Sequence, residues 1–69
     1  MTDKEKLLNM KEGETIYLNM VNDGGVQIHM HNYEYQLFEI PVYGGQPRFY
    51  DIYEPKNIDK MIEEYQSWT

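Results

Sequence analysis

At 69 residues, with 12 acidic and 6 basic side chains and no cysteine, the chain has the size of one small acidic domain, residues 1–69. Its formal charge of −6 repels phosphate backbones, which argues against ordinary binding of duplex nucleic acid. Nucleophilic catalysis needs an activated side chain beside a base, and the single serine, Ser67, stands near the chain end, so we expect a non-enzymatic binding protein.

The first predicted element is a helix over residues 3–12. Thr2 followed three residues later by Glu5 is a capping-box pattern, and Gly13 is a suitable residue to end the helix. Period-two alternation of apolar side chains then predicts a strand over residues 16–20 that is buried on one side.

Asn, Asp and Gly residues over 22–25 predict a tight turn, because these residues tolerate the positive backbone angles that hairpins need. The strand over residues 26–31 is therefore expected to return antiparallel to the first. Its apolar face is formed by Val26, Ile28 and Met30, and its polar face by Gln27, His29 and His31.

Residues 33–42 predict a third strand with bulky side chains on both faces, which we interpret as burial on two sides or a bulge. Pro41 has no amide hydrogen for a ladder, so it favours an edge position or the end of that strand. Gly and Pro residues over 43–48 predict a second turn, and a fourth strand over 48–53 follows it.

A terminal helix is predicted after Asn57, a suitable N-cap. Apolar side chains recur at helical spacing in Ile58, Met61, Ile62, Tyr65 and Trp68. The sequence thus predicts an α+β fold: a short N-terminal helix, a four-stranded antiparallel meander and a C-terminal helix.

Two terminal helices cover only one face of such a sheet well, so the other face meets solvent or another chain. We expect that face to carry some of Tyr17, His29, His31, Phe38 and Ile40, with either Tyr50 or Tyr53. A core of this size is also marginal, and disulfides are excluded by the lack of cysteine. Self-association is the remaining way to stabilise such a small core, which predicts a homo-oligomer.

No run of about 18 apolar residues is present that would span a bilayer, and the first residues lack an apolar signal-peptide segment. We therefore expect a cytoplasmic protein that does not contact the membrane. Two histidines and scattered carboxylates do not make a closed tetrahedral metal site, so no metal or cofactor is expected.

Two short segments carry the candidate binding residues. His29 and His31 project together from one strand face, where they suit hydrogen bonding to a ligand or simple solvation; Glu34 is the only nearby third metal ligand. The glycine pair before Arg48 lets backbone amides approach an anion while the single arginine clamps it, although a plain hairpin turn also explains the glycines. The candidate ligand-binding residues are Arg48, Tyr43, Gly44, Gly45, His29, His31 and Tyr50.

The carboxylates show no pair suited to acid–base catalysis. A solvated acidic surface is the plain interpretation, and imitation of a nucleic acid that captures a basic groove on a host protein is the sharper one. Seven tyrosines, two phenylalanines and one tryptophan suit stacking on nucleobases or filling pockets on a protein partner, although several must belong to the core.

The C-terminal half contains Tyr33-Glu34-Tyr35-Gln36-Leu37-Phe38-Glu39-Ile40-Pro41-Val42-Tyr43-Gly44-Gly45 and ends Ser67-Trp68-Thr69. With its tyrosine-rich strands, acidic charge and lack of a catalytic set, the chain resembles the very small proteins that bacteriophages encode against host defence. That resemblance implies one of two functions. The first is an oligomeric sponge that sequesters a small nucleotide-like signal between subunits, and the alternative is an acidic, aromatic-rich inhibitor that blocks a basic host defence protein in the host cytoplasm.

Overall fold

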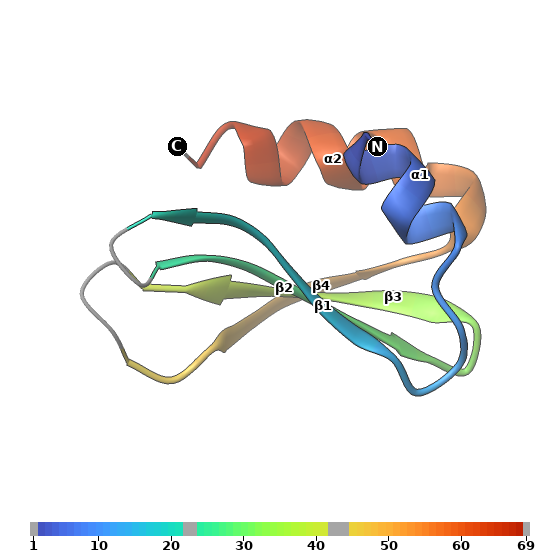
Figure 1. The fold of residues 1–69 in the computed structure, drawn as a ribbon, viewed down its shortest axis with the longest axis horizontal. Coiled ribbons are helices and arrows are strands. Elements are labelled where there is room, and N and C mark those ends of the chain that lie inside the picture. The colour runs from blue at the N-terminus through green and yellow to red at the C-terminus, as the bar shows by residue number, and fades with distance from the viewer. Residues whose placement is uncertain (1, 22–23, 42–44, 69) are drawn as a thin grey trace.

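The computed structural model describes residues 2–21, 24–41 and 45–68, with backbone only for 19–21. Four strands form one antiparallel sheet in the order β1-β2-β3-β4, and both helices lie in a layer on one side of it (Figure 1). The elements are α1 (Asp3–Leu8), β1 (Thr15–Val21), β2 (Gly24–His31), β3 (Glu34–Ile40), β4 (Arg48–Tyr53), the 3-10 helix η1 (Pro55–Asn57) and α2 (Ile58–Gln66). The predicted α+β meander between two helices is confirmed.

The hydrophobic core lies between the helices and one face of the sheet, which we call the covered face. Alternate residues of the strands supply it, as period-two spacing requires. The strands contribute Leu18, Val26, Ile28, Met30, Tyr35 and Leu37, and the helical layer contributes Leu7, Met10, Ile58, Met61 and Tyr65. The predicted stripe of α2 is confirmed, with Ile62 and Trp68 partly buried at its margin.

Helix α1 begins as predicted and ends earlier. The capping box is present in both directions, because the Thr2 hydroxyl accepts from the Glu5 amide and the Glu5 carboxylate accepts from the Thr2 amide. The helix stops at Leu8 and does not reach residue 12. The cause is tertiary: the Glu12 carboxylate accepts the amides of Asn32 and Tyr33 at 2.9 Å, and the Gly13 amide donates to the Met30 carbonyl at 2.9 Å, so the end of the predicted helix is bonded to β2 and to the turn after it.

The strand bounds differ from the prediction mainly at the turns. Tyr33, which was expected in the third strand, lies in the turn between β2 and β3, where Asn32 and Tyr33 have φ values of 53° and 61°. Both central residues of a type I′ hairpin turn need such positive angles. Of the expected turn over 22–25, Gly24 and Gly25 belong to β2, and residues 22–23 lie outside the described part of the chain.

The predicted irregularity in the third strand is found on its partner. The ladder between β3 and β4 passes from Leu37 opposite Asp51 to Phe38 opposite Phe49, which leaves Tyr50 as one extra residue on β4. This is the arrangement of a β-bulge, which bends the bulged strand and redirects its side chains. Strand β3 itself is internal, pairing with both β2 and β4, and ends before Pro41.

Candidate binding surface

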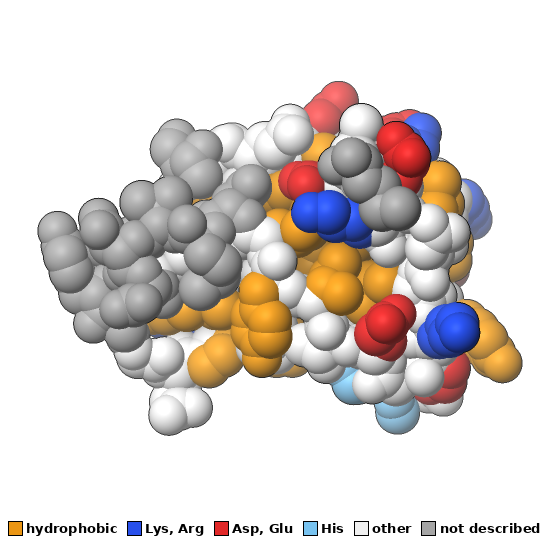
Figure 2. Space-filling view, in the orientation of Figure 1, with side chains coloured by type: hydrophobic (Ala, Val, Ile, Leu, Met, Phe, Trp, Pro, Cys, Tyr) orange, Lys and Arg blue, Asp and Glu red, His pale blue; other side chains and the backbone are white. Residues whose placement is uncertain are grey.

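The sheet face turned away from the helices is the candidate binding surface, and we call it the open face. Its members are the strand residues that alternate with the core positions and pair with one another across the ladders. They are Thr15, Tyr17, Gly25, Gln27, His29, His31, Glu34, Gln36, Phe38, Ile40, Phe49 and Ile52. Figure 1 shows neither helix on this side, and Figure 2 shows histidine side chains along the lower edge, opposite the helices.

Aromatic side chains form a row across the open face. The register places Tyr17 beside Gln27, Gln27 beside Phe38, and Phe38 beside Phe49, so the row crosses all four strands. Phe38 and Phe49 meet edge to face with ring centroids 5.7 Å apart. Tyr17 is 58% exposed and Phe49 is 56% exposed. Aromatic rings held this way on a sheet offer flat apolar surface to a ligand or a partner.

The open face is nearly free of charge. Among its members Glu34 is the single carboxylate, at the end of the sheet next to the β2–β3 turn, and no member is Lys or Arg. The other acidic side chains of the described residues lie elsewhere on the surface of a molecule whose formal charge is −6. The open face is therefore a surface on which this acidic molecule places few like charges.

His29 and His31 lie side by side on this face, as their spacing predicts. Their rings stack with centroids 6.4 Å apart and planes inclined by 20°. The His29 Nδ1 atom is hydrogen-bonded to the Thr15 hydroxyl at 2.7 Å, and Glu34 stands opposite His31 in the ladder. Across the described residues no three His, Asp or Glu side chains gather in a group able to hold a metal ion. The pair is arranged for hydrogen bonding at the margin of the aromatic row.

The other candidate ligand residues lie apart from the histidines. Arg48 is exposed opposite Glu39, at the far end of the sheet and on the covered side of the register. Gly45 has a φ of 119° and lies near the Pro41 side chain, while Tyr43 and Gly44 lie outside the described residues. The described members of the candidate set are thus spread over both faces and both ends of the sheet.

Tyr50 and Tyr53 do not lie on the open face, contrary to the expectation that one of them would. Tyr53 packs against the core, and Tyr50 meets Trp68 of the C-terminal segment edge to face at 5.0 Å. The bulge at Tyr50 is the reason, because the extra residue shifts the alternation of β4. Phe49 and Ile52 take the open positions, which simple alternation along the sequence would have put on opposite faces.

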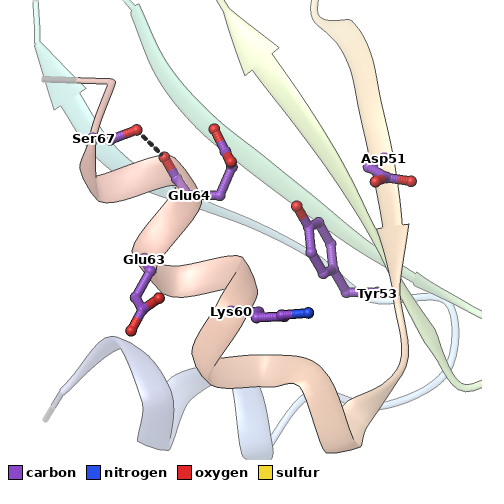
Figure 3. A pocket seen from close by; sticks show the side chains of 6 residues that line it. All are labelled: Asp51, Tyr53, Lys60, Glu63, Glu64 and Ser67. Atoms are coloured by element: carbon purple, nitrogen blue, oxygen red, sulfur yellow. Dashed lines mark hydrogen bonds between the residues drawn. The ribbon is translucent and has the colours of Figure 1, made fainter.

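A second surface feature, a hollow between β4 and α2, has no counterpart in the sequence analysis. It is lined by Asp51, Tyr53, Lys60, Glu63, Glu64 and Ser67, as Figure 3 shows. Glu64 accepts a hydrogen bond from Trp68 Nε1 at 3.1 Å, and its bond with the Tyr50 hydroxyl raises the pKa of Tyr50. Asp51 accepts from the Ile52 amide at 2.8 Å. Two of its three carboxylates are therefore engaged in structural hydrogen bonds, and the lining is acidic with one lysine.

Comparison with models of protein families, with curated proteins and with solved structures gives no match to this chain. No helix within the described residues is long and apolar enough to cross a membrane. The chemistry of the surface itself must therefore carry any functional conclusion.

Proposed function

We propose that this protein is a non-enzymatic, self-associating binding protein that sequesters a small nucleotide-like ligand against the aromatic row of its open face. The observation that supports this most is the exposure of Tyr17 and Phe49, with Phe38 between them, on a sheet face nearly free of charge. Stacking of a base on an aromatic side chain is worth about 1–3 kcal/mol. The proposal includes a phage-type anti-defence role in the host cytoplasm, where a sponge acts by holding a signal without altering it.

The ligand's negative charge requires a counterpart in an acidic protein. Arg48 is the single arginine and directly precedes Phe49 at the start of β4. A guanidinium offers a forked, permanent charge to a phosphate, which a solvated lysine matches less well. In this proposal the rings take the base and His29 and His31 supply hydrogen bonds on the same face. Arg48 lies on the covered side of the register at the start of the edge strand β4, and it pairs with the phosphate around that edge.

The test begins with protein purified from its natural host and examined by native mass spectrometry for a bound small molecule. Purified protein is then screened against cyclic and ADP-ribose-type nucleotides by thermal shift, with Phe49→Ala and Leu8→Ala compared. Leu8 is 58% exposed on α1 and gives a matched apolar truncation away from the sheet. We expect Phe49→Ala to weaken binding about tenfold or more and Leu8→Ala to leave it unchanged. No shift across the panel and no co-purified ligand would contradict the proposal.

An acidic inhibitor of a basic host protein is the second candidate, and the hollow between β4 and α2 favours it. Three carboxylates, those of Asp51, Glu63 and Glu64, line this hollow against one lysine, Lys60. Such a surface attracts a cationic partner through long-range forces that salt screens. Two results would favour this candidate over the sponge. The affinity for a basic partner would fall steeply with ionic strength, and Glu63→Gln would weaken it while Phe49→Ala would not.

A further inference from the structure

We infer that the occupant of the open face is a second copy of this chain, packed sheet to sheet about a two-fold axis. The inference builds on the self-association in the proposed function and identifies the surface that performs it. Three open-face side chains, Tyr17, Phe49 and Ile52, are 58%, 56% and 45% exposed, although Phe and Ile are residue types that folding normally buries. Packing against another apolar surface would bury these exposed side chains.

The near absence of charged side chains on the open face decides which class of partner suits it. A nucleic acid needs Lys or Arg along its path to neutralise phosphates, and the open face has neither. A basic protein gains most from the acidic hollow between β4 and α2, which Asp51, Glu63 and Glu64 line against Lys60. The open face matches a partner surface that is itself apolar and nearly uncharged.

The chain's own open face is such a surface. Two copies of a molecule with a formal charge of −6 repel each other wherever carboxylates are brought together. On the open face the single carboxylate, Glu34, stands at one end and leaves the aromatic row clear. Contact through this face therefore buries the rings while it brings few carboxylates together.

Symmetry supports the same arrangement. A two-fold interface uses one patch on both subunits, so the patch must be complementary to itself. The aromatic row has Tyr17 on one side of Gln27 and the contacting rings of Phe38 and Phe49 on the other, so a second copy turned by half a rotation presents the same rings to the first. Face-to-face sheets pack about 10 Å apart with their side chains interdigitated, so a flat ligand enclosed in the seam would stack between rings of the two copies.

The first experiment measures sedimentation of the ligand-free protein over a wide concentration range. The variants are Phe49→Glu, which places a carboxylate in the row, and Leu8→Glu, which places the same charge at an equally exposed apolar position on α1. We expect a dimer whose dissociation constant rises at least tenfold in Phe49→Glu and stays unchanged in Leu8→Glu. A monomer at every concentration, or a dimer that Phe49→Glu does not weaken, would overturn the inference.

A second experiment does not depend on how well Phe49→Glu folds. Because the chain has no cysteine, Gln36→Cys introduces a unique thiol at a central position of the open face, and Leu8→Cys introduces one on the helical side. A short bis-maleimide reagent should link two copies of Gln36→Cys in high yield and leave Leu8→Cys largely unlinked. Equal linking of the two variants would contradict a sheet-to-sheet seam.

These measurements separate the inference from the ligand proposal. A dimer with the expected dependence on Phe49 that retains no nucleotide from its host, and shows no thermal shift, refutes the sponge and leaves the interface standing. A monomer that retains a nucleotide refutes the interface and leaves ligand binding standing.

Discussion

The two faces of the sheet are built from the same four strands. They differ in how completely their side chains are buried and hydrogen-bonded. On the covered face Ile28 and Leu37 are fully buried, and the hydroxyl of Tyr35 donates to the Leu7 carbonyl at 2.9 Å. In the described residues no buried side-chain nitrogen or oxygen lacks a hydrogen-bond partner. On the open face Tyr17 and Phe49 remain more than half exposed. The covered face specifies the fold, and the open face is left available for recognition.

The largest expected difference in stability comes from making the same change, isoleucine to alanine, on each face. Ile28→Ala removes a fully buried side chain and should destabilise the fold by about 2–5 kcal/mol, because it loses burial and leaves a cavity. Ile52→Ala removes the same atoms from a side chain that is 45% exposed, and the cost should stay below about 1 kcal/mol. Urea unfolding followed by circular dichroism at low micromolar concentration measures both values. Equal losses would mean that the open face is as structural as the covered one.

A smaller difference is expected for tyrosine hydroxyls. The Tyr65 hydroxyl donates to Asp3 Oδ2 at 2.8 Å and joins α2 to α1, so Tyr65→Phe should cost about 1.5–3 kcal/mol, the range for a hydrogen bond to a charged group. Tyr17→Phe removes a hydroxyl from an exposed ring on the open face and should cost little. Chemical denaturation of the two variants measures this contrast, and a loss in Tyr17→Phe as large as that in Tyr65→Phe would contradict it.

The same hydroxyl predicts a dependence on alkaline pH. Burial, with the hydrogen bond to Asp3, raises the pKa of Tyr65 above its ordinary value of 10.0. Above pH 10 the unfolded chain therefore releases this proton while the folded chain keeps it, and stability falls as pH rises. Tyr65→Phe should make the decline above pH 10 shallower than in the unmodified protein when chemical denaturation is repeated over alkaline pH.

Short-range signals in the sequence predicted most of the fold. Each of these signals depends on residues close together in the sequence, and each is found in the structure. They are the capping box of Thr2 and Glu5, the alternation in β2 and the stripe of Met61 and Tyr65. What failed depended on pairing between distant segments. The early end of α1 accompanies the bonds of Glu12 to the Asn32 and Tyr33 amides and of Gly13 to Met30, which no local pattern around α1 reveals.

The candidate site was predictable to a similar extent. The sequence indicated an open aromatic face that includes Tyr17 and Phe38, and the register supports that placement. It missed Phe49, because the bulge at Tyr50 changes the alternation of β4 and is visible only in the pairing with β3. Ligand contact by the candidate residues stays a prediction, since their functional roles depend on molecules outside the chain.

The smallest expected effect concerns the end of the sheet that carries His31 and Glu34. The Glu12 carboxylate accepts hydrogen bonds from the amides of Tyr33 and Asn32, each at 2.9 Å. These two bonds lower the pKa of Glu12 below its ordinary value of 4.5. The folded chain therefore holds this proton less tightly than the unfolded chain, so the stabilisation is full above about pH 4.5 and is lost as pH falls through the lowered value.

Glu12→Gln should consequently flatten the acid limb of the stability curve and speed amide exchange at Asn32 and Tyr33, two residues whose positive φ values the carboxylate helps to hold. Glu39→Gln is the matched control, because Glu39 is also exposed but lies on β3, at the opposite end of the sheet. Thermal unfolding from pH 7 to pH 3, with hydrogen exchange at pH 7, provides the measurement. If both variants flatten the acid limb equally, general relief of charge explains the effect, and the turn does not depend on Glu12.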